Sequence, residues 1–211
     1  MNDDQISAEE MKVRMLSGEL YRPVGEEIAR DQARAEDLLE RYNATRHTDL
    51  ELRSSLLGEL LGDVGSDVIV RPPFYCDYGS NITIGVGTFV NFGCVMLDVA
   101  PIRIGANCQI ATGVHIVTAT HPVDPEPRRL GWESAQPVTI GHNVWLGSAV
   151  VVCPGVTVGD DTVVGAGAVV THDLPASVVA LSVPARVVRE IGVADRVDFP
   201  TPNHWGGGRS L

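Results

Sequence analysis

The fold of this chain is decided by residues 140–174, whose sequence is IGHNVWLGSAVVVCPGVTVGDDTVVGAGAVVTHDL. A large aliphatic residue returns at every sixth position, beginning with Ile140, Leu146 and Val152. A second, mostly small apolar series follows each of these residues by four positions and begins at Val144. A period of six fits neither the 3.6-residue turn of a helix nor the two-residue alternation of a strand. It is typical of a hexapeptide-repeat parallel β-helix.

The repeat extends backwards through the chain to about Ser66. Val70, Cys76 and Ile82 belong to an earlier part of the second series, and a two-residue insertion near Pro101 shifts the phase. About 15 hexapeptides are present in all. If three short strands make one triangular turn, the sequence predicts a mainly β fold of about five coils.

The chain divides into three segments by pattern. We expect an N-terminal helical cap over residues 1–62, a β-helix domain over 63–185, and a C-terminal segment and tail over 186–211. Within the cap, helices are expected over 8–16 and 26–41. A third is expected after a capping box formed by Thr48 and Glu51. A short amphipathic piece is expected over 186–193, and a mobile tail over 201–211.

A long insertion over residues 121–137 interrupts the repeat a second time. Twenty-four residues separate Ile116 from Ile140 where the repeat predicts six, and four prolines lie in the inserted stretch. We therefore expect an irregular loop. Long loops on a regular scaffold usually carry functional groups, so this loop is the first place to look for chemistry.

Composition and charge exclude several classes of partner. The chain has 16 Lys and Arg against 27 Asp and Glu, for a net charge of −11, which argues against nucleic acid and anionic membranes as partners. Met1–Glu10 contains no apolar signal-peptide core, and no run of 18 apolar residues is present. The four cysteines lack the CxxC spacing of zinc and redox sites, and three of them fall on the inward i+4 position of the repeat, so we expect buried free thiols, a cytoplasmic protein and no metal.

Several motifs resemble those of the maltose and galactoside O-acetyltransferases of the hexapeptide-repeat acyltransferases. The motifs are Gly-Glu-Leu-Tyr at 18–21, Tyr-Gly-Ser-Asn-Ile at 78–82, Val-Asn-Phe at 90–92, Thr-Ala-Thr-His-Pro-Val-Asp at 118–124, Ile-Gly-His-Asn-Val-Trp-Leu-Gly at 140–147 and Val-Pro-Ala-Arg at 183–186. The resemblance implies a left-handed β-helix, a homotrimer with active sites between subunits, and acetyl-CoA as co-substrate. The motifs favour the maltose branch, which implies acetyl transfer to a hydroxyl of a sugar such as maltose or glucose.

The resemblance also implies the catalytic residues. His121 opens the long loop and is the expected general base, since an imidazole with a pKa of about 6.5 suits proton abstraction at neutral pH. Asn91 is expected to stabilise the transition state and contact the acceptor. Asp77 is an expected sugar contact, and Asp98 is either a second contact or a group that orients His121. Each has a structural alternative: Asn91 could bond the backbone of the adjacent coil, and Asp77 could be a solvated carboxylate.

The coenzyme A contacts implied by the resemblance are Ser148, Ala166, Thr171, His172, Arg186 and Arg189. A guanidinium forms bidentate pairs with phosphate, which suits the two arginines to the nucleotide end of the co-substrate. The alternative is that both arginines are ordinary solvated charges at the end of the solenoid.

Four positions depart from the family pattern. Pro23 replaces a sugar-binding aspartate and Val99 a second acidic residue, which leaves the acceptor open. His172 replaces a lysine and Ser182 a glycine near the expected coenzyme A site. The alternatives in function are an acetyltransferase for an aminosugar, galactoside or antibiotic hydroxyl, a γ-type carbonic anhydrase using zinc-binding histidines, and a non-catalytic solenoid.

Overall fold

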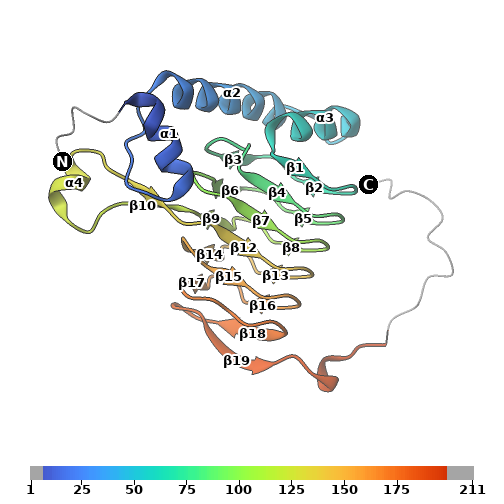
Figure 1. Cartoon of the computed structure of the whole chain (residues 1–211). Coiled ribbons are helices and arrows are strands. Elements are labelled where there is room, and N and C mark those ends of the chain that lie inside the picture. The colour runs from blue at the N-terminus through green and yellow to red at the C-terminus, as the bar shows by residue number, and fades with distance from the viewer. Residues whose placement is uncertain (1–6, 199–211) are drawn as a thin grey trace.

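The chain forms a parallel β-helix closed at one end by helices, as the sequence predicts (Figure 1). The computed structural model describes residues 7–198, so the tail over 201–211 lies outside the described residues. Five complete coils of three strands are followed by a partial sixth coil that contributes one strand. The expected count of about five coils is therefore confirmed.

Each coil contributes one strand to each of three parallel faces. Face 1 contains β1 (Asp63–Val64), β4 (Ile82–Ile84), β7 (Ile102–Ile104), β12 (Val138–Ile140) and β15 (Thr157–Val158). Face 2 contains β2 (Ile69–Val70), β5 (Phe89–Val90), β8 (Gln109–Ile110), β13 (Trp145–Leu146), β16 (Val163–Val164) and β18 (Val178–Leu181). Face 3 contains β3 (Phe74–Cys76), β6 (Cys94–Leu97), β9 (His115–Val117), β14 (Val151–Val152) and β17 (Val169–Val170).

Both apolar series of the repeat point into the prism. Leu146, Val152 and Val158 from the first series and Val144 and Val150 from the second are at most 1% exposed. Small residues occupy the next position because the coils are close there. A Cβ on Gly147 would lie 2.5 Å from the backbone nitrogen of Ala166 in the following coil. The six-residue period therefore results from two requirements, apolar side chains in the interior and small residues where successive coils approach closely at the corners.

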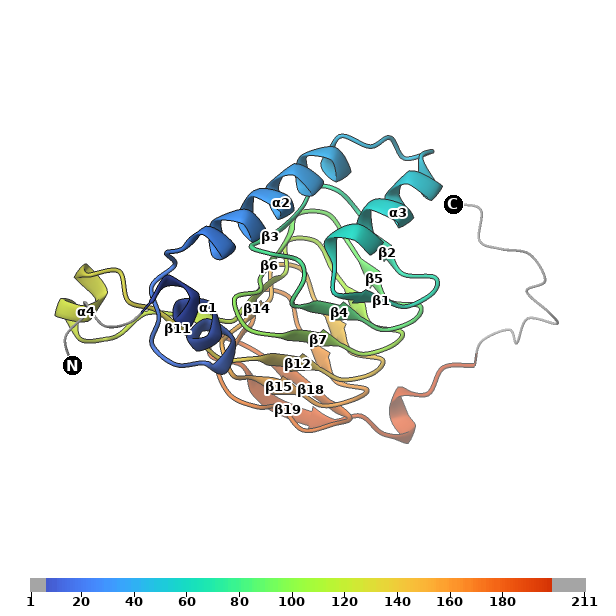
Figure 2. The ribbon, with the colours of Figure 1, turned by 45° about the horizontal axis from the view of Figure 1, so that its top comes forward.

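The N-terminal cap covers the open end of the first coil. It consists of α1 (Ala8–Ser17), α2 (Glu26–Asn43) and α3 (Leu50–Leu60), and α2 and α3 lie across the top of the prism in Figure 2. Leu38, Leu56 and Leu60 join the core of the β-helix. The Asn43 side chain donates to the carbonyl of Phe74 and accepts from its amide, both at 2.9 Å. The cap thus satisfies backbone groups that would otherwise be an exposed strand edge.

The predicted capping box before α3 is wrong. The N-cap residue is Asp49, and no side chain of the helix entrance accepts from its first turn. Asp49 instead accepts a hydrogen bond from the amide of Arg46 at 2.9 Å, and the Thr48 hydroxyl lies near Asp49 rather than over the helix. Thr48 and Asp49 therefore make their contacts within the turn that precedes α3 and do not cap the helix.

The long loop is more regular than four prolines suggest. Its base is an antiparallel ribbon of β10 (Ala119–Thr120) and β11 (Ser134–Ala135), and its tip contains the short helix α4 (Pro125–Arg129). Pro125 occupies the first turn of α4, where a missing N–H costs nothing, and Asp124 caps that turn. The expectation of an irregular loop is therefore corrected for both its base and its tip.

The other end of the prism is closed by a strand. β19 (Arg186–Glu190) pairs antiparallel with β18, so the segment expected to be a short amphipathic piece is the edge strand of face 2. A 3-10 turn, η2 (Val193–Asp195), follows it. Cys76, Cys94, Cys108 and Cys153 are free. Within residues 7–198, no helix has the length and apolar character needed to cross a membrane.

Candidate active site

The predicted site residues gather at two corners of the prism. The first corner is the set of turns that follow the face 2 strands, and the second corner is the set of turns that follow the face 3 strands. Face 3 lies between them. Parallel pairing stacks equivalent residues of successive coils above one another, so each corner forms a column along the prism.

The first corner holds Asn91, Ser148 and Ala166. Val90 pairs with Ile110, Ile110 with Leu146 and Leu146 with Val164, so the residues that follow these four strands stack in one column. The Asn91 side-chain oxygen accepts from the amide of Phe92 at 2.9 Å, which fixes the side chain on its own turn rather than on the adjacent coil. Its amide nitrogen makes no hydrogen bond to the described residues and is free to donate to a ligand.

The second corner holds Asp77 and Asp98. Asp98 is fully buried, and its carboxylate accepts from the amides of Asp77 at 3.0 Å, Tyr78 at 2.9 Å and Asn81 at 3.2 Å. Both carboxylate oxygens are thus used to hold the turn that carries Asp77. Because the carboxylate is enclosed, we assign Asp98 a positioning role instead of the expected contact with an acceptor or with His121.

Burial at the second corner changes the acidity of its carboxyls. Desolvation, then the charges of Asp98 and Glu133, raise the pKa of Asp77 to about 6. Burial also raises the pKa of Asp98, although hydrogen bonds from backbone amides oppose the shift. Burial and the neighbouring carboxylates raise the pKa of Tyr78 to about 12, so its phenol stays protonated at neutral pH.

His121 and Asn91 lie at opposite ends of face 3. Asn91 precedes β6, whereas His121 leaves the prism beyond the far end of β9, the strand that pairs with β6 and leads into β10. The strand of this face that follows Asn91, β6, has four residues, which at 3.3 Å per residue is about 13 Å and exceeds the reach of two side chains in contact. His121 itself is exposed at the end of β10. One chain therefore does not bring the two predicted catalytic residues together.

The expected coenzyme A contacts are divided between the same corners. Ser148 and Ala166 are exposed at the first corner, one coil apart, and Arg186 starts β19 opposite Leu181, just below that column. Thr171 and His172 are exposed at the second corner, where the Thr171 hydroxyl and His172 Nδ1 are 2.9 Å apart. Arg189 differs from the rest, because its guanidinium forms an ion pair with Asp195 at 2.8 Å.

Tyr21 and Glu133 are polar residues of this region that the sequence did not single out. The Tyr21 hydroxyl donates to the Glu133 carboxylate at 2.8 Å, and the two backbones exchange two hydrogen bonds of 2.9 Å. Tyr21 appears in a quoted motif, and Glu133 lies in the long loop. Their contact depends on strand pairing at the base of the long loop, and the sequence did not predict this pairing because four prolines indicated an irregular loop.

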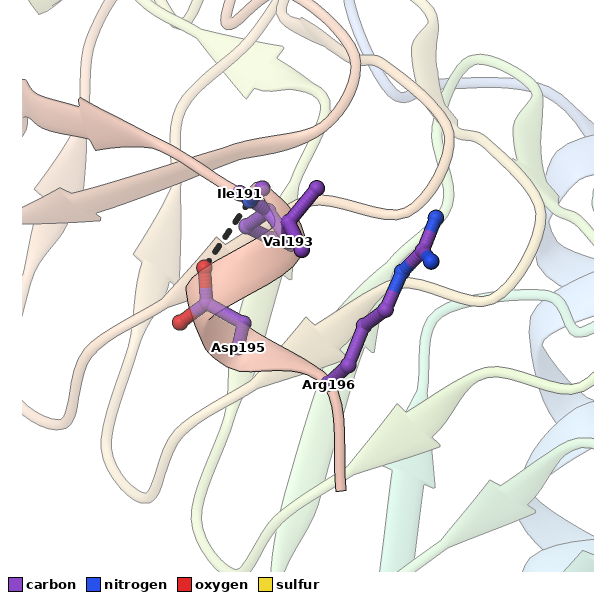
Figure 3. A pocket seen from close by; sticks show the side chains of 5 residues that line it. Ile191, Val193, Asp195 and Arg196 are labelled. Carbon is purple, nitrogen blue, oxygen red and sulfur yellow. Dashed lines mark hydrogen bonds between the residues drawn. The ribbon is translucent and has the colours of Figure 1, made fainter. Parts of the chain in front are cut away.

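Two surface concavities of the single chain lie away from His121 and Asn91. One is formed by residues 191–196, where Asp195 accepts from the backbone and the Arg196 side chain extends to one side (Figure 3). The other lies between the end of α1 and the base of the long loop, and Arg103 lines it. Within the described residues, no group of three or more His, Cys, Asp or Glu side chains is arranged to hold a metal ion.

Comparison with known proteins identifies the family. The maltose acetyltransferase hexapeptide capping motif matches residues 14–65, and the bacterial transferase hexapeptide of six repeats matches 137–172. The galactoside O-acetyltransferase of Escherichia coli K12 is 41% identical over 186 residues, which cover 88% of this chain and 92% of that protein. The chain belongs to the maltose and galactoside O-acetyltransferase family. It is therefore an acetyltransferase of the hexapeptide-repeat class.

Solved structures of this acetyltransferase family have the same fold. A maltose O-acetyltransferase from Clostridium difficile 630 superposes with a TM-score of 0.86 at 41% identity, covering 88% of this chain and all of that one. A hexapeptide-repeat acetyltransferase from Vibrio cholerae O1 biovar eltor, solved in complex with acetyl coenzyme A, has a TM-score of 0.81 at 36% identity. That match covers 85% of this chain and 97% of the other.

The structure explains part of how this acetyltransferase departs from the family pattern. Val99 is 6% exposed and packs with Met15, Tyr78 and Trp132, so an apolar contact takes the place of an acidic side chain. Ser182 has a φ of +85°, in the left-handed region that glycine adopts without strain. This conformation explains why the family pattern has a glycine at this position. Pro23 is exposed and offers no side-chain hydrogen bond.

Proposed function

We propose that this acetyltransferase moves the acetyl group of acetyl-CoA to a hydroxyl of a sugar, with His121 as the general base. One observation carries the proposal. In this chain, a member of the family, the exposed His121 and the carboxylate of Asp77 lie at one corner of face 3, and the amide donor of Asn91 lies at the other corner. The relatives named as galactoside and maltose O-acetyltransferases support the reaction type, and the acetyl coenzyme A complex of a third supports the co-substrate.

Each residue has a distinct part in the proposed reaction. The acetyl donor supplies a thioester carbonyl that the acceptor oxygen attacks. His121 takes the proton of the acceptor hydroxyl and later returns it to the departing thiol. The Asn91 amide donates a hydrogen bond where negative charge develops on the carbonyl oxygen. Asp77 accepts hydrogen bonds from further hydroxyls of the acceptor, on a turn that Asp98 holds in place.

The distribution of residues over two corners supports a site shared between subunits. His121, Asp77 and Thr171 lie at the second corner, whereas Asn91, Ser148 and Ala166 lie at the first. A cyclic homotrimer that apposes the first corner of one subunit with the second corner of the next completes the set. The proposed co-substrate then lies along the prism, with Arg186 near its phosphates.

The acceptor we propose is maltose or glucose. Asp77 is available to sugar hydroxyls, while the buried Val99 and exposed Pro23 remove polar groups from two other positions. The test is thiol release from acetyl-CoA in the presence of maltose, glucose, galactosides and aminosugars. The proposal expects the highest kcat/KM with maltose or glucose. A preference for galactosides or aminosugars contradicts the acceptor assignment, and no thiol release with any of them contradicts the reaction.

The carbonic anhydrase alternative depends on histidines that could hold zinc. His142 Nδ1 accepts from the Ala106 amide at 3.0 Å, which occupies one nitrogen of a ring that such a site requires. Metal analysis of the purified protein together with a CO₂ hydration assay separates the two functions. Stoichiometric zinc together with CO₂ hydration activity supports the anhydrase. Thiol release from acetyl-CoA by protein that contains no zinc and hydrates no CO₂ supports the acetyltransferase.

A further inference from the structure

The outward side chains of face 3 differ in character from those of face 1. The middle position of each strand points away from the interior, because the residues on both sides of it point inward. On face 1 the residues at this position are all polar and stack in the order Asp63, Thr83, Arg103, Thr139 and Thr157. On face 3 the corresponding column is Tyr75, Val95, His115, Val151 and Val169. An imidazole therefore interrupts a column made otherwise of valine and tyrosine.

His115 lies at the middle of face 3 and points away from the prism. Val114 before it and Ile116 after it are both 0% exposed, so the imidazole projects to the opposite side. Its neighbours in the column are Val95 and Val151, which are half-buried and apolar. The His115 side chain is exposed in the single chain and forms no hydrogen bond with another described residue. The chain itself thus gives this imidazole no partner.

The proposed trimer encloses this column. It apposes the first corner of one subunit with the second corner of the next, and face 3 lies between those two corners. Face 3 of every subunit therefore turns toward the three-fold axis. This placement suits a column of valines better than it suits the polar column of face 1. Continuity with the proposed shared site thus identifies two further copies of this chain as what covers face 3.

The dimensions of face 3 bring three copies of His115 close to that axis. β6 alone spans about 13 Å, and a face of one six-residue repeat with its corners spans about 20 Å. Three such faces joined at their corners form an equilateral triangle, whose centre lies about 4–6 Å from the middle of each side. This distance is close to the length of a histidine side chain, so the three imidazoles reach the axis together.

Three imidazoles enclosed by valines need a common partner. A buried polar nitrogen without a hydrogen bond is costly, and Val95 and Val151 offer none. Three neutral imidazoles around one point are a ligand set that Zn²⁺ accepts, with Zn–N distances of about 2.0–2.1 Å and a fourth position for water. The net charge of −11 also favours a cation at the centre of the assembly.

We propose that the trimer binds one divalent transition-metal ion of the zinc type on its three-fold axis, through His115 of each of the three subunits. One chain supplies a single ligand, which agrees with the lack of a three-residue metal group within residues 7–198. The ion stabilises the assembly and takes no part in acetyl transfer, because His121 and Asn91 lie at the two ends of face 3. The inference rests on the proposed function, since it uses the homotrimer proposed there.

The test measures zinc binding by the full-length protein after its metal has been removed with EDTA. Isothermal titration with ZnCl₂ is expected to give one ion for every three chains. Bound zinc is expected to raise the melting temperature by about 3–6 °C, because the ion binds only the folded trimer. Co²⁺ in place of zinc is expected to show the strong visible absorption of a four-coordinate ion.

Two variants separate the axial site from other zinc binding. His115→Val removes the ligand and matches Val95 and Val151, so the trimer is expected to remain assembled while zinc binding and the zinc-dependent rise in melting temperature are lost. His47→Val is the matched control, since His47 is exposed between α2 and α3, away from face 3. This control is expected to bind zinc as the wild type does. Light scattering verifies that each protein contains three chains.

Several results would overturn the inference. A trimer that binds no zinc refutes it, and so does His115→Val protein that binds as much zinc as the wild type. A ratio of one ion per chain also contradicts a single axial site. Each of these results leaves the proposed function standing if the metal-free wild type still releases thiol from acetyl-CoA, as we expect. If light scattering shows no trimer, the shared site fails first and the axial ion fails with it.

Discussion

At the scale of single residues, Asp77 is held in a costly environment. Its carboxyl is half-buried and close to Asp98 and Glu133, and its pKa of about 6 exceeds the unperturbed value of 3.8. Because the folded-state pKa is the higher one, the stability from the protonated carboxyl is fully present below about pH 3.8. It is lost as the pH rises through about 6, so the ionised group opposes folding at neutral pH.

The first prediction follows from this cost. Asp77→Asn is expected to raise stability at pH 7.5 by about 1 kcal/mol, less than the roughly 3 kcal/mol of a two-unit shift because the carboxyl is partly solvated. The melting temperature is expected to rise by about 2–4 °C at pH 7.5 and to be unchanged at pH 4. The same variant is expected to raise KM for the sugar.

Thermal unfolding at the two pH values checks the stability part, with Asp63→Asn at an exposed strand position as control. An equal gain at both pH values means that the ionised carboxyl is not the cause. An unchanged KM for the acceptor means that Asp77 does not contact it.

Sequence patterns singled out the proposed general base more readily than the residues around it. His121 follows the deepest break in a six-residue period, and a break of phase is visible in one dimension. Asp98 was named through the family resemblance, but only its burial and three amide donors reveal that it holds a turn. Glu133 gave no signal, because its meaning depends on pairing with Tyr21, 112 residues away.

At the scale of elements, the close packing of successive coils at the corners determines which substitutions the repeat tolerates. The second prediction compares two glycines. Gly147→Ala places a Cβ 2.5 Å from the Ala166 backbone nitrogen, and overpacking against backbone is expected to cost about 1–3 kcal/mol. Gly58→Ala in α3 meets nothing within 4 Å and is expected to stabilise by about 0.5–1 kcal/mol. Denaturant unfolding measures both, and equal effects would contradict the account of the corners.

The third prediction concerns the cap. Asn43→Ala removes a side chain that satisfies both backbone groups of Phe74 at the open edge of the first coil. Leaving two such groups without a partner is expected to cost about 2–4 kcal/mol in the free energy of unfolding. The control is Glu40→Ala on the exposed side of the same helix, expected within about 0.5 kcal/mol of the wild type. A loss from Asn43→Ala no larger than the control's shows that the cap does not seal this edge.

Element boundaries show where local sequence rules fail. The helices over 8–16 and 26–41 were predicted nearly as they are, since their apolar spacing agrees with their packing. The capping box failed because Asp49 bonds the Arg46 amide of the preceding turn. The prolines of the long loop did not prevent order, because Pro125 begins a helix instead of interrupting one.

At the scale of the whole molecule, a prism of stacked coils separates its two working corners by a full face. Sequence periodicity predicts the stacked coils, because every coil repeats the same local rules, but it does not predict the edge strand β19 that follows the last repeat. The site residues were predicted only from the family resemblance, because the repeat contains no information on which corners of neighbouring subunits face each other. In the homotrimer that we propose, closed cyclic symmetry gives one complete site per subunit.

The fourth prediction tests that arrangement. Co-expressed His121→Ala and Asn91→Ala subunits, each inactive alone, are expected to recover about a quarter of wild-type activity. Random assortment makes three quarters of the trimers mixed, and each mixed trimer has about one intact site in three. The mass of the assembly by light scattering should be three times 22.6 kDa. No recovery in demonstrably mixed trimers contradicts a shared site.

The central claim is that an exposed histidine at the break in the repeat performs the proton transfer. The most direct measurement is the rate of thiol release from acetyl-CoA by wild-type and His121→Ala protein, with saturating maltose or glucose. We predict a loss of about 10²- to 10⁴-fold in kcat with a melting temperature unchanged within about 2 °C, because His121 is exposed. An equal rate in the folded variant would contradict the account.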